Sequence, residues 1–147
     1  MENGWNVSDT QLKEFLNLTA KKQYDNVFIF VHQVIWQNPG LTPQIIPNDT
    51  EGRAPVNEFY PNAIQVLSQN ETPVYLFAGD VGAMPVGSEL AIHKYKNVRF
   101  VASGMGGGKW DNLVDVTVKN GKASINIHYL NGHKPMNIDE HYVPIVF

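Results

Sequence analysis

Two runs of consecutive apolar residues constrain the fold of this 147-residue chain more than any other feature. Val27–Val31 and Val74–Ala78 each contain five apolar residues, most of them β-branched or aromatic. Continuous runs of this kind are typical of strands buried on both faces, as in the parallel sheet of an α/β protein. The segment between the runs is long enough for a right-handed crossover, so we expect the two strands to be parallel neighbours.

The segments around these strands are expected to be helical or irregular. Apolar residues recur with helical spacing from about Thr10 to Ala20 and predict a first helix. Pro61 opens a second, short helix. The stretch from about Gln37 to Phe59 contains four prolines and no periodicity, which predicts a long loop of the kind that often forms a lid or a binding loop.

The second half of the chain changes from continuous apolar runs to alternation with a period of two. A third strand is predicted at Val98–Ala102, and alternating segments follow at 111–119 and 123–130. Asn120-Gly121 between them is the strongest short sequence signal for a hairpin. The segment 142–147 is a candidate for a last strand. The sequence thus predicts a single α/β domain with an α+β tendency, in which a mixed sheet with two parallel strands precedes an antiparallel hairpin.

Composition excludes several classes of function. The chain has no cysteine, so it forms no disulfide and has neither a thiol nucleophile nor a cysteine ligand for zinc. Its net charge of -3, with scattered lysines and arginines, argues against a nucleic-acid-binding protein. No apolar stretch reaches the ~18 residues that cross a membrane, and the amino terminus lacks the pattern of a signal peptide. We therefore expect a cytoplasmic protein without membrane contact.

His32 and Asp80 are the candidate metal ligands. His32 ends the first apolar run, and Asp80 follows the second. Sites of open α/β sheets lie outside the carboxyl ends of the strands, and an imidazole with a carboxylate suits a divalent metal ion. The alternative is that a loop covers His32 and that Asp80 only turns the chain before Gly82. The other histidines, at positions 93, 128, 133 and 141, have no ligand spacing and are expected at the surface.

Trp36, Gly104 and Gly106 are the candidates for contact with a substrate. Trp36 follows His32 closely and would either line a pocket or lie in the core. The glycine-rich run from Gly104 to Gly108 could present backbone amides to a phosphate group. It lacks the glycine patterns of nucleotide-binding loops, however, and a tight turn between two strands is the favoured alternative.

The order of these segments resembles the carboxyl-terminal half of the calcineurin-like metallophosphoesterase domain. The resemblance depends on a strand that ends in His32, a strand followed by Gly79-Asp80, and Val101–Gly107 ahead of two alternating strands. It covers most of the chain, although no single motif is specific. It implies half of an αββα sandwich over residues 1–131, with residues 132–147 as a tail.

The resemblance also implies a centre with two divalent metal ions, of the Mn, Fe, Zn or Mg class, that hydrolyses phosphoesters. In that family the motifs D-x-H, G-D and G-N-H-E/D precede the strand that ends in histidine, and G-H-x-H follows it. His32 matches the strand-ending histidine and Gly79 the glycine of G-H-x-H, but Asp80 and Gly82 replace the two histidines of that motif. The earlier motifs are absent. The chain therefore offers too few ligands for two ions ~3.5–4 Å apart.

Two main hypotheses follow, beside a chance likeness to an unrelated small α/β domain. In the first, the chain is an incomplete or degenerate phosphoric ester hydrolase half, inactive by itself, whose missing amino-terminal half completes the site for a small phosphoester. In the second, it is a non-catalytic binding or assembly module that keeps the fold and needs no metal.

We also expect the chain to associate with itself. Half of a sandwich leaves an apolar sheet face without cover, and large apolar patches are rare on monomers. A homodimer or higher oligomer in which sheet faces or edges meet would cover it. If the proline-rich loop and the tail fold back over that face instead, the chain would be a monomer.

Overall fold

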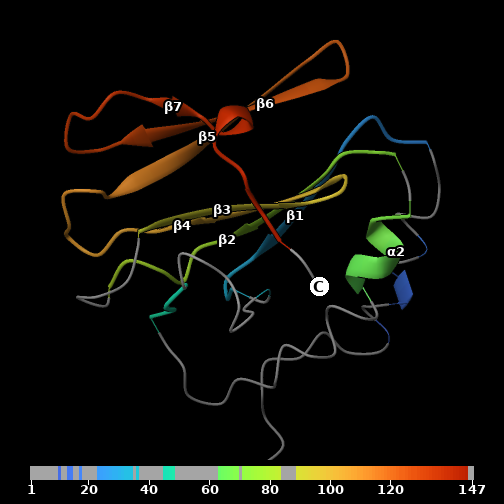
Figure 1. Ribbon diagram of the computed structural model, residues 1–147, viewed down its shortest axis with the longest axis horizontal. Helices are drawn as coiled ribbons and strands as arrows, with labels where there is room; N and C mark the ends of the chain where they lie inside the picture. The colour runs from blue at the N-terminus through green and yellow to red at the C-terminus, as the bar shows by residue number, and fades with distance from the viewer. Residues whose placement is uncertain are drawn as a thin grey trace, which may run out of the picture.

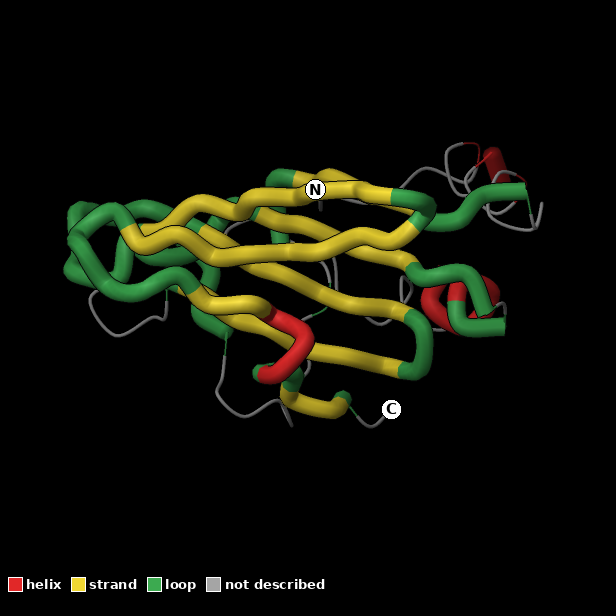
Figure 2. Tube along the Cα trace, turned by 90° about the horizontal axis from the view of Figure 1, so that it is seen from above, coloured by secondary structure: helices red, strands yellow, loops and turns green. Residues whose placement is uncertain are grey.

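The structure is a computed structural model in which two β-sheets pack face to face (Figures 1 and 2). It describes residues 10, 13–14, 17, 23–34, 36, 45–48, 63–69, 71–83 and 89–145. In chain order the elements are β1 (Val27–Val31), α2 (Gln65–Leu67), β2 (Val74–Ala78), β3 (Leu90–Tyr95), β4 (Val98–Ser103), β5 (Asn112–Lys119), β6 (Lys122–Tyr129), β7 (Met136–Asn137), the 3-10 helix η3 (Ile138–Glu140) and β8 (Val143–Pro144). The first sheet has the strand order β1-β2-β4-β3-β8, and the second has the order β5-β6-β7.

The predicted parallel pairing of the two apolar runs is confirmed. β1 pairs with β2 in parallel, with Val27 opposite Val74, and β4 pairs with the other side of β2 in parallel. All five residues of β2 are buried, as expected for a central strand. The prediction that β1 is also buried on both faces is wrong, because β1 lies at the end of the described sheet and Phe30 is 72% exposed.

The predicted hairpin at Asn120-Gly121 is confirmed. β5 and β6 are antiparallel, and Lys119 lies opposite Lys122 across the two-residue turn. Asn120 and Gly121 have φ angles of 52° and 75°. Positive φ at both turn residues gives the backbone the twist that fits a hairpin. One face of each strand packs toward the first sheet, and its residues are Val114, Val116, Ile125 and Ile127.

Three strands are missing from the sequence prediction or are shorter than predicted. β3, which pairs antiparallel with β4, was not predicted, since the buried polar residue His93 interrupts its apolar pattern. The segment after residue 131, expected to be an irregular tail with a candidate strand at 142–147, adds β7 to the second sheet and, within that candidate strand, β8 to the first. Ile138 between them is fully buried. This segment therefore belongs to the core and links the two sheets.

Apolar side chains form two clusters, one on each face of the first sheet. Successive residues of β2 alternate between them: Leu76 joins the outer cluster, and Tyr75 and Phe77 join the cluster between the sheets. Ile64 and Leu67, in and beside α2, cover the outer cluster. The buried members of the cluster between the sheets are Tyr75, Phe77, Ile92, Val101, Ile125, Ile127 and Ile138.

Helix makes up little of the described part, which is a sheet-rich fold with one mixed and one antiparallel sheet. The short helix after Pro61 is present as α2. Residues 10, 13, 14 and 17 of the expected first helix are helical, and its other residues lie outside the described residues, as does most of the 37–59 loop. Among the helices that are described, none is long and apolar enough to cross a membrane.

His93 is a buried histidine in the middle of β3, so the expectation that it lies at the surface is wrong. Neither of its ring nitrogens has a hydrogen-bond partner among the described residues. Burial lowers the pKa of His93 to about 4, because a charged imidazole would lose its hydration. The ring is therefore neutral at pH 7 and acts as a core side chain.

We predict that the folded chain loses stability between pH 6.5 and pH 4 through His93. The unfolded chain takes up this proton near pH 6.5 and the folded chain only near pH 4, so the unfolded state binds more protons in that interval. The shift corresponds to about 3 kcal/mol. Urea unfolding at several pH values should show a smaller loss in His93→Leu than in the original chain. Equal losses in both would contradict the burial of His93.

Candidate functional site

The carboxyl ends of the parallel strands β1, β2 and β4 meet at one edge of the first sheet. Val31 lies opposite Ala78, and Ala78 lies opposite Ala102. His32 and Asp80 follow the first two strands, and the glycine-rich loop that joins β4 to β5 follows the third, at the left of Figure 1. We call this region the carboxyl edge.

His32 and the turn after β2 are joined by backbone hydrogen bonds. The carbonyl oxygen of His32 accepts from the amides of Gly79, at 3.0 Å, and Asp80, at 3.1 Å. A side chain at position 79 would begin 3.8 Å from His32 Nδ1, so the imidazole lies beside this glycine. His32 is exposed, whereas Asp80 is only 4% exposed. The structure thus brings the two candidate ligands to neighbouring strand ends, and their binding of metal stays a prediction.

A short segment of the predicted long loop is attached to the turn that contains Asp80. The Asn48 amide donates to the Asp80 carbonyl at 2.9 Å, and Asn48 Oδ1 accepts from the Ala83 amide at 2.6 Å. Pro47 forms an isolated antiparallel bridge with Val81. Asn48 has no sequence signal for this position, since only tertiary structure brings it to this turn. These contacts attach residues 47 and 48 to the turn after β2.

The backbone amides of the glycine-rich loop bind a carboxylate of the same chain, that of Asp111. The amides of Gly106, Gly107 and Gly108 donate to the carboxylate of Asp111 at 3.0, 3.1 and 3.0 Å. A carboxylate that accepts from three amides replaces the phosphate group that the loop was considered for. This arrangement fits the favoured alternative, a tight turn between β4 and β5. Asp111 was missed in the sequence, although an aspartate shortly after a glycine run is a common turn signal.

Gly104 and Gly106 allow the loops after β2 and β4 to touch. A Cβ atom at Gly104 would overlap the carbonyl of Val81, and one at Gly106 would overlap the carbonyl of Gly82. The Gly104 amide donates to the Glu89 carbonyl at 3.0 Å. Both glycines therefore have a packing role that requires no ligand. Contact of either with a substrate stays a prediction.

Trp36 lies in the core, which is one of the two positions considered for it. Its side chain is fully buried in the outer cluster, and its ring centroid is 5.4 Å from that of Phe100. Its indole Nε1 has no hydrogen-bond partner among the residues that are described. Trp36 thus packs beneath the sheet in the described structure, and a contact with substrate is not needed to explain its position.

An aromatic group that was not predicted lies at the same edge. The rings of Trp110 and His133 stack with centroids 4.2 Å apart, and Tyr129 meets Trp110 edge-on at 5.7 Å. Lys109 Nζ lies 5.2 Å from the Trp110 ring centroid. All of these contacts are made within the chain. The aromatic group therefore packs the β4–β5 loop against the end of β6.

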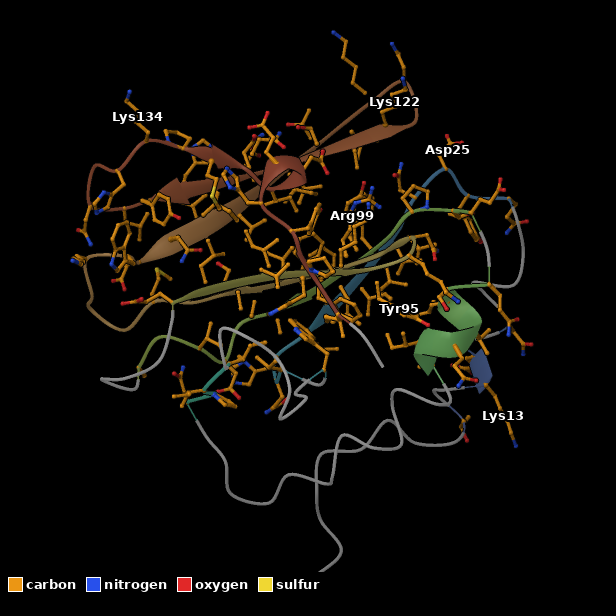
Figure 3. The ribbon with its side chains drawn as sticks, in the orientation of Figure 1. Lys13, Asp25, Tyr95, Arg99, Lys122 and Lys134 are labelled. Carbon is orange, nitrogen blue, oxygen red and sulfur yellow. The ribbon has the colours of Figure 1, made fainter. Side chains whose placement is uncertain are left out.

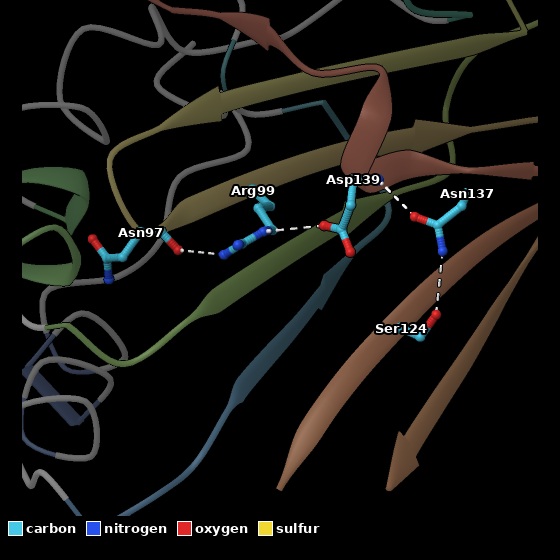
Figure 4. A network of polar contacts seen from close by, with 5 residues as sticks. All are labelled: Asn97, Arg99, Ser124, Asn137 and Asp139. Atoms are coloured by element: carbon cyan, nitrogen blue, oxygen red, sulfur yellow. Dashed lines mark hydrogen bonds and ion pairs between the residues drawn. The ribbon is translucent and has the colours of Figure 1, made fainter.

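A second polar region lies away from the carboxyl edge, between the two sheets (Figures 3 and 4). Arg99 Nε is 3.8 Å from Asp139 Oδ1, and its guanidinium lies 5.1 Å from the Tyr75 ring centroid. Asn137 accepts from the Asp139 amide at 2.9 Å and donates to Ser124 Oγ at 3.3 Å. These contacts join η3 to both sheets.

The surface beside this network is an open depression of about 530 Å³. Its lining residues are Lys94, Tyr95, Lys96, Asp139, Glu140, Tyr142, Pro144 and Ile145. Burial raises the pKa of the Tyr142 phenol, and Arg99 offsets this only in part. Tyr142 therefore stays protonated at neutral pH and cannot serve as a base there.

The metal ligands in the described part of the chain are too few for a two-metal centre. No group of three or more His, Asp or Glu side chains is arranged there to hold an ion. His32 and Asp80 by themselves offer one nitrogen donor and one carboxylate. A pair of ions needs a larger cage of ligands, so these residues do not fit a complete centre and we derive no reaction through it.

Comparisons with protein-family models, with curated proteins and with solved structures give no match to this chain. No relative therefore assigns a role to His32, Asp80 or the glycine-rich loop. The candidate roles depend on the positions of these residues in the fold.

We predict that Gly104→Ala and Gly106→Ala each destabilise the fold by about 2–3 kcal/mol, because the new methyl group overpacks against backbone. The control is Gly107→Ala, where φ is 81° and no atom lies within 4 Å. Only backbone strain of about 1 kcal/mol is expected at that position. Urea unfolding of the three variants measures the difference. A cost at Gly104 and Gly106 no larger than at Gly107 would contradict the close approach of the two loops.

Proposed function

We propose that the chain supplies one side of a metallophosphoesterase-like domain and does not hydrolyse phosphoesters by itself. The finer fold in this proposal is half of an αββα sandwich, in which the first sheet is an inner layer and α2 is the helix on its outer face. The parallel order β1-β2-β4 and the position of α2 over the outer cluster support it.

The observation that carries the proposal is the junction of His32 with Gly79-Asp80. A strand-ending histidine and a glycine-aspartate turn lie on adjacent parallel strands, and the carbonyl of His32 accepts from both amides of that turn. This is where open α/β sheets place their sites. We propose that His32 and Asp80 are the ligands that this chain contributes to a divalent ion of the Mn, Fe, Zn or Mg class.

The proposed substrate class is a small phosphoester, and the remaining ligands would come from outside this sequence. The D-x-H and G-N-H motifs do not occur at the positions where the resemblance requires them. Without the ligands of these motifs, the two metal ions that stabilise the transition state of phosphoester hydrolysis cannot both be bound. Loss of activity in the isolated chain follows from this ligand count.

The second candidate function is a non-catalytic assembly module. Asp111 favours it, because its carboxylate occupies the amides that could have received a phosphate group. Exposure of Phe30 at the end of the first sheet favours it too. In this case the carboxyl edge is a structural turn and binds no metal.

We predict weak binding of Mn²⁺ or Zn²⁺ that is lost in His32→Ala, without hydrolysis of an aryl phosphate. Titration calorimetry measures the binding, and release of the aryl alcohol measures the hydrolysis. His128→Ala is the matched control, because His128 is also a partly accessible histidine but lies on β6, where its neighbour is Asp115 at 3.9 Å.

Two results would decide against this proposal in different ways. Metal-dependent turnover that disappears in His32→Ala would show a working enzyme in this chain alone. Absence of metal binding, or equal binding by His32→Ala and the original chain, would leave the assembly module as the function.

A further inference from the structure

One edge of β1 has no neighbouring strand among the described residues, and the sequence of this strand is a palindrome. Its five residues, Val27-Phe28-Ile29-Phe30-Val31, read the same in both directions. They include no charged residue and no proline, although exposed edge strands are usually protected by such residues. Phe30 is 72% exposed, the highest value among the exposed large apolar side chains of the described residues.

The backbone of β1 presents two residues to this open edge. The Val27 amide donates to the Pro73 carbonyl at 3.0 Å, so the peptide groups of Val27 face β2. Peptide groups alternate in direction along a strand, and those of Phe28 and Phe30 therefore point away from β2. No strand in the described part of the chain lies on that side.

We propose that β1 is the interface of a homodimer, in which it pairs antiparallel with β1 of a second copy about a two-fold axis at Ile29. In this register Phe28 lies opposite Phe30 of the second copy, and both are residues whose amides and carbonyls point outward. They form hydrogen-bonded pairs on either side of the axis, while Ile29 faces its own copy in a non-hydrogen-bonded pair. The two-fold axis makes both halves of the interface the same, and the palindrome places identical residues opposite each other, valine opposite valine and phenylalanine opposite phenylalanine.

The side chains continue across this interface. Phe28 stacks on Tyr75 with ring centroids 5.3 Å apart, and Phe30 stacks on Phe77 at 5.1 Å. Pairing of Phe28 with Phe30 of the second copy joins these stacks into one aromatic row, and aromatic cross-strand pairs stabilise sheets. It also covers Phe30.

The charges next to β1 are compatible with the same register. Asn26 lies opposite His32 of the second copy, and Asp25 lies opposite Gln33, so no like charges face each other directly. A second copy therefore fits this edge without electrostatic repulsion between the facing residues. The proposal does not depend on metal at His32 or on the phosphoesterase resemblance.

The mass of the chain in solution tests the dimer. Light scattering at micromolar concentration should give about twice 16.5 kDa for the original chain and 16.5 kDa for Phe30→Lys. The control is Met105→Lys, since Met105 is 63% exposed and lies in the β4–β5 loop; it should remain a dimer. A monomeric original chain, or a Phe30→Lys variant as dimeric as the control, would overturn the proposal.

Single cysteines test the register without disturbing the edge with a charge. The chain has no cysteine of its own. In the proposed register two copies of position 29 have Cα atoms about 4.5 Å apart, within the range that a disulfide spans. Ile29→Cys should therefore form a disulfide-linked dimer quickly under mild oxidation.

Val27→Cys is the matched control for the crosslink. Val27 belongs to the same strand, is partly buried and packs against the same outer cluster as Ile29. Its two copies would lie roughly 13 Å apart along the paired strands, too far for a disulfide. Crosslinking of Val27→Cys that is as fast as that of Ile29→Cys, or no crosslinking of Ile29→Cys, would overturn this register. Any dimer would then form through another surface, and the exposed edge of β1 would be left for a different chain.

Discussion

The burial of β2 on both faces is the constraint on which the rest of this structure depends. Its five apolar residues alternate between the outer cluster and the cluster between the sheets, so one short strand belongs to both cores. Each face of β2 therefore has to be covered, and different parts of the chain cover them. Ile64 and Leu67 pack on one side, and Ile125 and Ile127 of the hairpin pack on the other. The parallel neighbours β1 and β4 are then held in register, and their carboxyl ends meet.

The sequence predicts those parts of the fold whose signals are local. The hairpin needed only Asn120-Gly121 and two alternating segments, and β2 needed only its apolar run. β3 was missed because His93 is buried as a neutral side chain, a state that the sequence of β3 does not reveal. β7 has two residues, too few to show any period, whereas β8 lies within the candidate strand at 142–147. Exposure of Phe30 depends on which strand lies beside β1, and this is a property of the topology alone.

The difference between local sequence signals and contacts made only by the folded chain also applies to the candidate site. That His32 and Asp80 lie at neighbouring strand ends follows from two parallel strands, and the sequence contains that information. That Asp111 fills the glycine-rich loop depends on a return of the chain within a few residues, which glycine patterns do not specify. Gly104 is a glycine because the backbone of Val81 passes close to it. A glycine that could serve a ligand can thus be required at its position by the packing of the backbone alone.

The central claim about function is that His32 and Asp80 act together as ligands of one ion. Crystals of the chain grown with Mn²⁺ or Zn²⁺ test it most directly, through the anomalous scattering of the metal. We expect one peak within coordination distance of both the His32 imidazole and the Asp80 carboxylate, and its loss in Asp80→Ala. Saturating metal with no peak at the carboxyl edge, or a peak that Asp80→Ala leaves unchanged, would contradict it.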